Sequence, residues 1–357
     1  MIAFAGGPPE FLLHSDSPIY IHRILSMMKL VIQIPCYNEE DTLGPTLAAL
    51  PKSLPGIDLI ETLIIDDGSR DRTVEVARSY GVDHIVCFPT NRGLAKGFMA
   101  GLDASLRAGA DIIVNTDADN QYCADDIAEL VRPILEGTAE IVVGARPISQ
   151  IEHFSPVKKA LQKLGSFVVR VASRTDIPDA PSGFRAMSRD AAMRLNVFGE
   201  YTYTLETIIQ AGQKGMAITS VPVRTNGYTR PSRLMKSTAS YVKRSVSTIL
   251  HIYLVYKPRR TFNAIGAVFF SSGFLLGVRW LILYWSGTQR THIPSLILAA
   301  ILMLMGFQLW IFSLMAYLSE VNRKLLEDVQ FRLRRFDYMR QAKSSHHPCE
   351  ETDPRRR

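Results

Sequence analysis

The sequence predicts an α/β domain with a mostly parallel sheet, followed by two membrane-spanning helices. The first observation is that apolar runs typical of buried strands alternate with helical segments between residue 29 and about residue 144. The second is that two long, almost uncharged apolar segments occupy residues 262–286 and 293–319. Because strand–helix alternation favours parallel pairing, we expect helices to cover both faces of the sheet.

The predicted strands and helices follow one another in regular order. The apolar runs that we assign to strands cover residues 30–35, 60–65, 84–88, 111–115 and 140–144. The segments that we assign to helices cover residues 42–50, 71–79, 94–108 and 125–136. Residues 1–28 contain no basic stretch before an apolar run, so we expect no cleaved signal peptide there. We interpret them as a disordered or wrongly assigned N-terminal extension.

Charge and cysteine usage narrow the possible function classes. The chain has 41 Lys and Arg against 34 Asp and Glu, and its formal net charge of +7 favours an anionic partner. Its basic residues concentrate beside the long apolar segments, which argues against nucleic-acid binding. The 4 cysteines form no CxxC pair, so we expect no metal–thiolate cluster, only reduced thiols.

Both long apolar segments have the length of a membrane span. A helix needs about 20 apolar residues to cross a bilayer, and the only charge in either segment is Arg279. Basic residues flank the pair at both outer ends: Lys257, Arg259 and Arg260 before it, and Arg323, Lys324, Arg332, Arg334, Arg335 and Arg340 after it. Because such residues prefer the cytoplasmic side, both flanks should be cytoplasmic. A pair of helices buried in a soluble core is the alternative.

Two further segments, residues 155–173 and 235–254, combine apolar residues at helical spacing with Lys and Arg on the other faces. Basic amphipathic helices beside a membrane anchor are typical of contact with the membrane surface. Ordinary helices packed on their own domain would show a similar pattern, so that alternative stays open.

Polar residues gather where the predicted strands end. Ligands of parallel sheets bind beyond the carboxyl ends of the strands, and residues 35–40, 66–69 and 117–121 follow three of these ends. Crowded carboxylates repel one another unless a cation or hydrogen bonds compensate. Hard oxygen ligands suit Mg²⁺ or Mn²⁺, usually shared with substrate phosphates. The candidate metal ligands are Asp117, Asp119 and Gln121.

The segment from Arg92 to Lys96 opens the third predicted helix. Backbone N–H groups and basic side chains at a helix N-terminus favour an anion. The spacing does not fit a GxxxxGK[ST] phosphate loop, and routine helix capping with surface charges remains the alternative.

Taken in order, these motifs resemble those of the family 2 glycosyltransferases, above all the branch that makes polyprenyl-phosphate sugars, such as dolichyl-phosphate mannose synthase. The matching segments are residues 34–39, 64–73, 91–97, 117–121, 144–146, 179–185 and 205–206. The resemblance implies a GT-A fold, which is Rossmann-like, and an inverting, metal-dependent transfer from a GDP- or UDP-sugar. The implied acceptor is a polyprenyl phosphate, undecaprenyl or dolichyl. Bacterial members with two C-terminal helices extend the likeness to the membrane segments.

The resemblance also implies roles for individual residues. Contacts with the donor nucleotide would come from Pro35, Tyr37, Glu39, Ile65, Asp66, Asp67, Lys96, Asp117, Ala118 and Arg233. Catalytic roles would fall to Asp119, Asp179, Glu206, Arg146 and Arg185. Arg146 would lie near the donor or lipid phosphate, and Asp179 or Glu206 would act as a base only if the acceptor were a sugar hydroxyl. The metal, Mg²⁺ or Mn²⁺, would be held by Asp117, Asp119 and Gln121.

The sequence departs from the family pattern after the last core strand. The family often has Gly-x-Ser-Lys there, whereas this chain has Arg230-Pro-Ser232-Arg233. An Arg keeps the charge of the Lys but changes its geometry. Arg224 and Arg230 are both candidates for a further family Arg upstream.

We therefore expect a catalytic domain at 29–234, an interface helix at 235–261, spans at 262–286 and 293–319, and a cytoplasmic helix with a disordered tail at 320–357. The protein would be integral to the inner membrane of the cell, with a cytoplasmic catalytic domain in contact with membrane lipids. The helix at 320–340 would allow a homo-oligomer.

Two alternatives remain. A polysaccharide synthase of the same superfamily, using a saccharide acceptor, usually has Gln-x-x-Arg-Trp, but Leu276 precedes Arg279-Trp280 here. A catalytically inactive membrane adaptor with the same fold would not need the intact carboxylates at 117 and 119.

Overall fold

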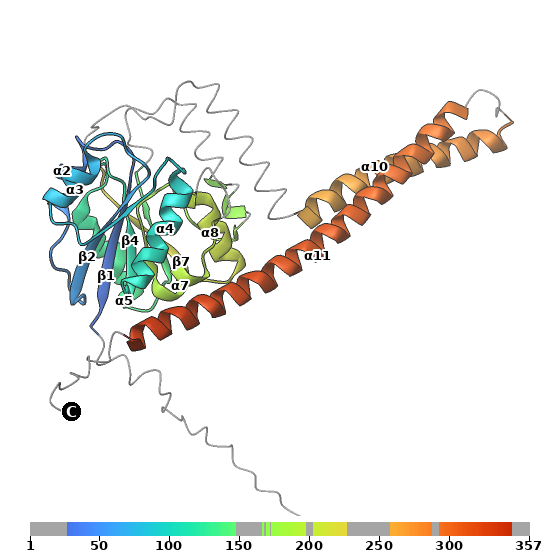
Figure 1. The fold of residues 1–357 in the computed structure, drawn as a ribbon. Coiled ribbons are helices and arrows are strands. Elements are labelled where there is room, and N and C mark those ends of the chain that lie inside the picture. Colours follow the sequence, from blue (N-terminus) through green and yellow to red (C-terminus); the bar gives the residue numbers. More distant parts are fainter. Residues whose placement is uncertain are drawn as a thin grey trace, which may run out of the picture.

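The computed structural model describes residues 27–147, 166–167, 169–171, 173–197, 203–226, 258–287 and 293–344. In this part of the chain, strands form one 7-stranded sheet with helices on both faces, and two long helices extend away from it (Figure 1). The predicted fold class, a mostly parallel α/β domain followed by a pair of long apolar helices, is confirmed.

The sheet has the strand order β3-β2-β1-β4-β6-β5-β7. The strands are β1 (Lys29–Cys36), β2 (Leu59–Asp66), β3 (His84–Cys87), β4 (Ile112–Asn115), β5 (Ile141–Ala145), β6 (Arg185–Ser188) and β7 (Ile218–Pro222). Strand β6 runs antiparallel between β4 and β5, and the other neighbours pair in parallel. The predicted strands correspond to β1–β5, whereas β6 and β7 follow the stretch for which strands were predicted.

Alternate residues of each central strand point to opposite faces of the sheet. Leu30, Ile32 and Ile34 pack under α2 (Leu43–Ala49), α3 (Thr73–Ser79) and α5 (Ile127–Leu135), the last preceded by the short η1 (Ala124–Asp126). Val31 and Ile65 pack under α4 (Leu94–Arg107), α7 (Arg189–Arg194) and α8 (Tyr203–Gln213). Burial on both faces explains why these strands read as continuous apolar runs in the sequence.

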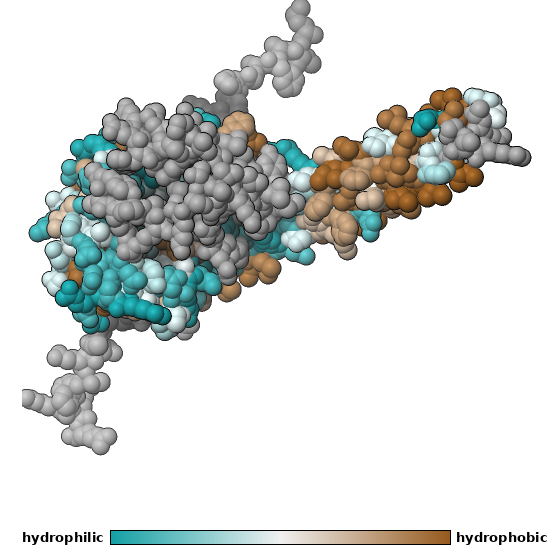
Figure 2. Space-filling model, turned by 90° about the horizontal axis from the view of Figure 1, so that it is seen from above, coloured by the Kyte–Doolittle hydropathy of each residue, from teal (hydrophilic) through white to brown (hydrophobic). Residues whose placement is uncertain are grey.

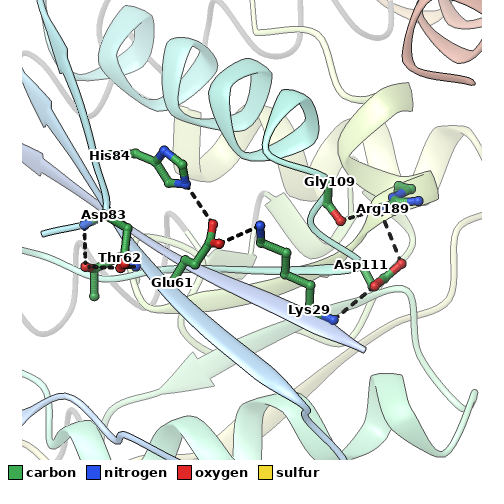
Figure 3. A network of polar contacts seen from close by, with 8 residues as sticks. All are labelled: Lys29, Glu61, Thr62, Asp83, His84, Gly109, Asp111 and Arg189. Atoms are coloured by element: carbon green, nitrogen blue, oxygen red, sulfur yellow. Dashed lines mark hydrogen bonds and ion pairs between the residues drawn. The ribbon is translucent and has the colours of Figure 1, made fainter. Parts of the chain in front are cut away.

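A polar network joins the strands at the amino end of the sheet, opposite the predicted site (Figure 3). Lys29 and His84 both contact Glu61, at 2.6 and 2.7 Å. The backbone N–H of Lys29 donates to Asp111, which also pairs with Arg189 at 3.4 Å. These contacts tie β1, β2, β3 and the start of α7 together, so this end of the domain is fixed by side chains with no part in the site.

The two long helices, α10 (Pro258–Trp285) and α11 (Ile293–Ser344), pack against each other as a hairpin. Small residues allow the close approach, since a side chain at Gly266, Gly273 or Gly306 would meet backbone atoms of the other helix within 3.0 Å. Both helices are long and apolar enough to cross a membrane, and only 11% of the most apolar window of each is buried. This exposure argues against the soluble-core alternative, and Figure 2 shows the apolar surface of the hairpin standing clear of the domain.

Helix α11 joins the second apolar segment and the predicted helix at 320–340 into a single helix of 52 residues. No Gly or Pro occurs between Phe307 and Ser344, so nothing in the sequence favours a break. Its C-terminal part packs against α7 and α4 of the domain.

Several expectations fall outside the described residues. They concern the segment 1–26, the interface helix predicted at 235–261 as far as residue 257, and the side chains of Arg230 and Arg233. Residues 258–261 form the start of α10. Of the segment 155–173, the described part begins at Ser166 and is helical, with Val169 buried and Phe167 and Val171 exposed.

Candidate active site

Three parallel strands bring the polar motifs to one edge of the sheet. Neighbouring strands β2, β1 and β4 lie in register, with Cys36 beside Asp66 and Gln33 beside Asn115. The loops that follow these strands, residues 37–42, 67–72 and 116–123, therefore start at the same edge. This is where ligands bind in sheets of this kind.

The first two loops are joined by hydrogen bonds. The backbone N–H of Asn38 donates to the Ser69 hydroxyl at 2.9 Å, and that of Arg70 donates to the Asn38 side chain at 2.8 Å. The N–H of Glu39 donates to the Thr73 hydroxyl at 2.8 Å. Glu39 is buried and accepts from Thr42, while Tyr37 is 40% exposed. Of these residues, Tyr37 and Arg70 are exposed.

The last residues of β1 and β2 pack against α4. Ile65 is fully buried, and both it and Pro35 lie against Gly97 of α4. Ile65 stays a predicted contact of the donor nucleotide, but its side chain packs under α4, so such a contact would come from its backbone.

Asp67 binds the start of α4. Its carboxylate accepts from the backbone N–H groups of Arg92 and Gly93 at 2.6 and 2.9 Å, and it is buried. Gly68 has a φ of +73°, and a side chain there would lie 2.7 Å from the backbone of Thr90. Loops 66–69 and 90–93 are thus in direct contact, which places the exposed Lys96, in the first turn of α4, at the same edge.

Asp117 and Asp119 lie in a tight turn after β4. The backbone N–H of Gln121 donates to Asp119 at 3.1 Å, and Asn120 adopts a φ of 53°. Asp117 is partly exposed. Burial and then the neighbouring Asp119 raise the pKa of Asp117 to about 7, against the opposing effect of Arg146 and Arg185.

These donors fit a divalent cation. Two carboxylates that disfavour each other's ionisation are stabilised by a cation between them, and Gln121 adds a neutral oxygen. No group of three or more His, Cys, Asp or Glu side chains suited to a metal occurs among the described residues. Two carboxylates and an amide leave coordination positions for a diphosphate and water, which is the usual arrangement for Mg²⁺.

A buried polar layer lies beneath Asp117. The Asn115 side chain accepts from Gln33 and donates to both the carbonyl of Gly183 and the hydroxyl of Tyr203, each at 2.9 Å. The N–H of Gly183 donates to the Tyr122 hydroxyl at 3.2 Å. A side chain on Gly183 would meet the Asp117 carboxylate at 2.9 Å. The layer therefore fixes the loop 179–185 directly against the candidate metal ligand.

We did not predict this layer from the sequence. Its members are Gln33, Asn115, Tyr122 and Tyr203. The available signal was that Gln33 and Asn115 interrupt otherwise apolar strands, since a polar residue in a buried strand needs a hydrogen-bond partner.

Arg146 and Asp179 pair with each other. The guanidinium donates twice to the carboxylate, at 2.7 and 3.1 Å, and the Asp179 side chain is 1% exposed. The backbone N–H of Arg146 also donates to Asp179. The roles expected for Arg146 and Asp179 stay predictions, and in this structure the two buried side chains neutralise each other.

Arg185 lies deeper in the domain, whereas Glu206 is partly exposed. Arg185 is fully buried, donates to Ser182 and Thr204 carbonyls, and has its pKa lowered by burial. It holds the loop that ends at β6 and does not reach the surface, so direct contact with substrate is not supported. Glu206, on α8, accepts from Gln210 at 3.4 Å.

The segment after β7 is fixed to the loop that carries Asp119. Asn226 donates to the carbonyls of Asn120 and Tyr122 at 2.9 and 3.2 Å. The Arg224 guanidinium donates twice to Asp126, at 2.9 and 2.7 Å. Arg224 is therefore paired with Asp126, and Asn226 lies beside the candidate metal turn.

Several known proteins are similar to this chain. The model of the family described as Glycosyl transferase family 2 matches residues 31–195. The chain is 30% identical over 217 residues to UDP-N-acetylglucosamine–dolichyl-phosphate N-acetylglucosaminyltransferase of Methanococcus voltae, covering 54% of this chain and 83% of that protein. It is 26% identical over 206 residues to undecaprenyl-phosphate mannosyltransferase of Micrococcus luteus, covering 55% and 83%.

A solved structure supports the fold. The chain is similar to glucosyl-3-phosphoglycerate synthase from Mycobacterium tuberculosis, crystallised with Mn²⁺, UDP and glucosyl-3-phosphoglycerate, with a TM-score of 0.50 and 18% identity. The match covers 64% of this chain and 79% of that one. At this identity the likeness bears on the GT-A-like fold alone. Family model, relatives and fold agree, and the chain belongs to glycosyl transferase family 2 as a glycosyltransferase.

Proposed function

We propose that this glycosyltransferase moves a sugar from a GDP- or UDP-sugar to a polyprenyl phosphate at the cytoplasmic face of the membrane. The observation that carries the proposal is that one chain combines the carboxylate turn of Asp117 and Asp119 with a hairpin of exposed apolar helices. The names of the two relatives, a dolichyl-phosphate and an undecaprenyl-phosphate glycosyltransferase, support the same acceptor class.

The proposed reaction is a single displacement. An oxygen of the lipid phosphate forms a bond to the anomeric carbon, and the bond from that carbon to the diphosphate oxygen breaks. The nucleoside diphosphate leaves with the bonding electrons, and the sugar is transferred with inversion. A phosphate monoester is largely ionised at neutral pH, with a second pKa of about 6, so the acceptor needs no general base.

The ion pair between Asp179 and Arg146 supports a phosphate acceptor. A sugar hydroxyl would need a carboxylate to take up its proton, but Asp179 is paired on two points with Arg146. Glu206 would then be the other candidate base. A lipid phosphate avoids this requirement, and its charge suits an edge that carries the exposed Lys96.

We assign the donor and metal roles as follows. Asp117, Asp119 and Gln121 would hold Mg²⁺ or Mn²⁺, and the loops of Tyr37, Glu39 and Asp67 would border the nucleotide. When bound, the cation neutralises charge that builds up on the leaving diphosphate. Arg233 would reach the same diphosphate.

The hairpin would place the domain at the bilayer. Its apolar stretches match the thickness of a membrane, and basic residues at both outer ends favour a cytoplasmic position for the domain and for the end of α11. An acceptor with a long isoprenoid chain remains in the bilayer, so an anchored enzyme meets it in two dimensions.

The test is a transfer assay on the full chain purified in detergent. Undecaprenyl phosphate, Mg²⁺ or Mn²⁺ and a panel of UDP- and GDP-sugars are supplied, with Asp119→Ala as the matched control. A glycolipid made by the wild type and lost in the variant supports the proposal and names the donor. Product with a saccharide acceptor alone refutes the lipid-phosphate acceptor, and absence of donor binding and turnover would instead favour an inactive adaptor.

A further inference from the structure

Helix α11 connects the apolar hairpin to the catalytic domain without a break. Its 52 residues give a rod of about 78 Å, far longer than the bilayer thickness of about 30 Å. The first charged residue after the apolar stretch is Glu320, and about 27 Å of helix separates it from Tyr338. The second half of α11 therefore lies outside the bilayer and reaches along the domain.

Ion pairs within the helix support the stretch between the bilayer and the domain. Lys324 pairs with Glu320 at 2.7 Å, and Arg332 pairs with Asp328 at 2.9 Å. Arg323 lies 3.9 Å from Glu327. Pairs four residues apart stabilise a helix, so this stretch is built to stay helical.

One face of α11 is docked on the domain. The residues on that face, spaced by four, three and four, are Glu327, Phe331, Arg334 and Tyr338. This spacing keeps side chains on one side of a helix. Phe331 and Tyr338 also pack against the hydrophobic core beneath α4, α7 and α8.

Each contact is specific in its chemistry. Glu327 pairs with Lys214 at 3.0 Å, and both side chains are mostly buried, at 13% and 21% exposure. The Arg194 guanidinium lies 5.3 Å from the centre of the Phe331 ring. The Tyr338 hydroxyl donates to Asp103 at 2.8 Å.

Arg334 binds the end of a helix. Its guanidinium donates to the carbonyls of Leu195 and Met193, at 3.1 and 3.3 Å, which are the open carbonyls at the C-terminus of α7. A cation at this position also interacts favourably with the helix dipole.

These contacts lie at the end of the sheet opposite the candidate site. Lys214 precedes β7, α7 starts where the antiparallel β6 ends beside the first residue of β4, and Asp103 is in the second half of α4. Figure 1 shows α11 ending beside the end of the sheet where β1 begins, while the hairpin and the carboxyl ends of the strands lie toward the upper side of the view. The docked α11 therefore orients the sheet edge that carries Asp117 and Asp119 toward the bilayer that the hairpin would span.

We propose that α11 is a rigid connection that sets the rotation and height of the candidate active site relative to the bilayer. Its residues Glu327, Phe331, Arg334 and Tyr338 are then positioning residues for transfer to a membrane-embedded acceptor. The inference rests on the proposed lipid-phosphate acceptor. Rotation is the sensitive variable, because each residue of a helix turns the docked face by about 100°.

The test changes the rotation while leaving every docking residue in place. Two alanines inserted between Asn322 and Arg323 turn the docked face by about 200° relative to the hairpin and lengthen the helix by about 3 Å. The matched control carries the same two alanines after Ser344, beyond the docked face. Full-length proteins are reconstituted in liposomes and given either undecaprenyl phosphate or a water-soluble ten-carbon isoprenyl phosphate.

We expect the insertion at 322 to lower transfer to undecaprenyl phosphate about a hundredfold, the order of loss that misplacement by an ångström or more produces. Transfer to the soluble acceptor and affinity for the nucleoside diphosphate should stay close to wild type, as should all activities of the control. Wild-type transfer to undecaprenyl phosphate by the insertion variant overturns the inference. Equal loss with both acceptors also overturns it, because α11 would then only stabilise the domain.

A charge reversal tests the same connection between α11 and the domain without an insertion. Glu327→Lys faces Lys214 with a like charge, and we expect about a tenfold loss with the long acceptor only. The double variant Glu327→Lys, Lys214→Glu should restore transfer, and failure of this rescue counts against a positioning role. If the wild type uses neither lipid phosphate, the proposed function itself is refuted, a result distinct from every outcome with the variants.

Discussion

A methyl group added at Gly183 should displace the candidate metal ligand Asp117. The Cβ of Gly183→Ala would lie 2.9 and 3.0 Å from the two carboxylate oxygens of Asp117 and 3.1 Å from the Tyr203 hydroxyl. Ordinary contact begins at 3.4 Å, so these groups must separate by about half an ångström. Gly183 cannot withdraw easily, because Asn115 and Tyr122 hold its carbonyl and its N–H. The carboxylate must therefore move.

These contacts determine the expected loss of stability and of transfer rate in Gly183→Ala. Overpacking of this kind destabilises a protein by about 1–3 kcal/mol, which lowers the melting temperature by several degrees. A displaced metal ligand should reduce the transfer rate about 10- to 100-fold, or about 1.4–2.7 kcal/mol, and raise the Mn²⁺ concentration needed for half-maximal rate.

The assay is the initial transfer rate at saturating donor, measured across a Mn²⁺ titration. Gly277→Ala is the matched control, because the same methyl group there meets nothing within 4 Å. Wild-type rate and wild-type Mn²⁺ dependence in Gly183→Ala would refute the view that Gly183 sets the position of Asp117.

Three further predictions concern the charged groups of the site. Because burial and Asp119 raise the pKa of Asp117 to about 7, the folded, metal-free protein holds this proton more tightly than the unfolded chain. Its melting temperature should therefore fall as the pH rises from about 4 to about 7, with Asp117 contributing at most about 1.4 kcal/mol per pH unit, and Asp117→Asn should remove that contribution. Asp119→Ala should abolish the strengthening of nucleoside-diphosphate binding by Mn²⁺, as measured by titration calorimetry; unchanged Mn²⁺ dependence would exclude Asp119 as a ligand. Asp179→Asn leaves the buried Arg146 without its counter-ion and should cost about 3–5 kcal/mol of unfolding free energy in a denaturant titration, and a change below about 1 kcal/mol would contradict the pairing.

Local patterns in the sequence were sufficient for much of the fold. Runs such as residues 30–35 are apolar at every position because both faces of the central strands are buried, and burial on both faces is what parallel pairing produces. The position of Asp117 and Asp119 directly after β4 also follows from one short segment.

The pairing of distant residues could not be predicted in the same way. Whether Arg146 faces a phosphate or Asp179 depends on how two loops 33 residues apart meet, and a single sequence does not contain that information. Similarly, Gln33 and Asn115 become partners only through the register of β1 and β4. Polar residues inside apolar strands signal that partners exist without identifying them.

Helix α11 combines features that the local sequence indicates with contacts that depend on tertiary packing. We predicted a span at 293–319 and a separate helix after it, but no Gly or Pro occurs between Phe307 and Ser344, and the two form one continuous helix. Phe331 and Tyr338, at helical spacing in a charged segment, indicate a second buried face. The surface that this face contacts, at α7 and α4, depends on tertiary packing alone.

The most direct test of the central claim compares two acceptors that differ by one phosphate. Liposomes with the full-length wild type receive a labelled nucleotide-sugar, Mn²⁺ and either undecaprenyl phosphate or undecaprenol, and the lipid extract is analysed by mass spectrometry. We predict a glycosyl-phospholipid with the phosphate acceptor and no product with the alcohol. Sugar transfer to undecaprenol, or to neither lipid while a saccharide acceptor is glycosylated, would contradict the account.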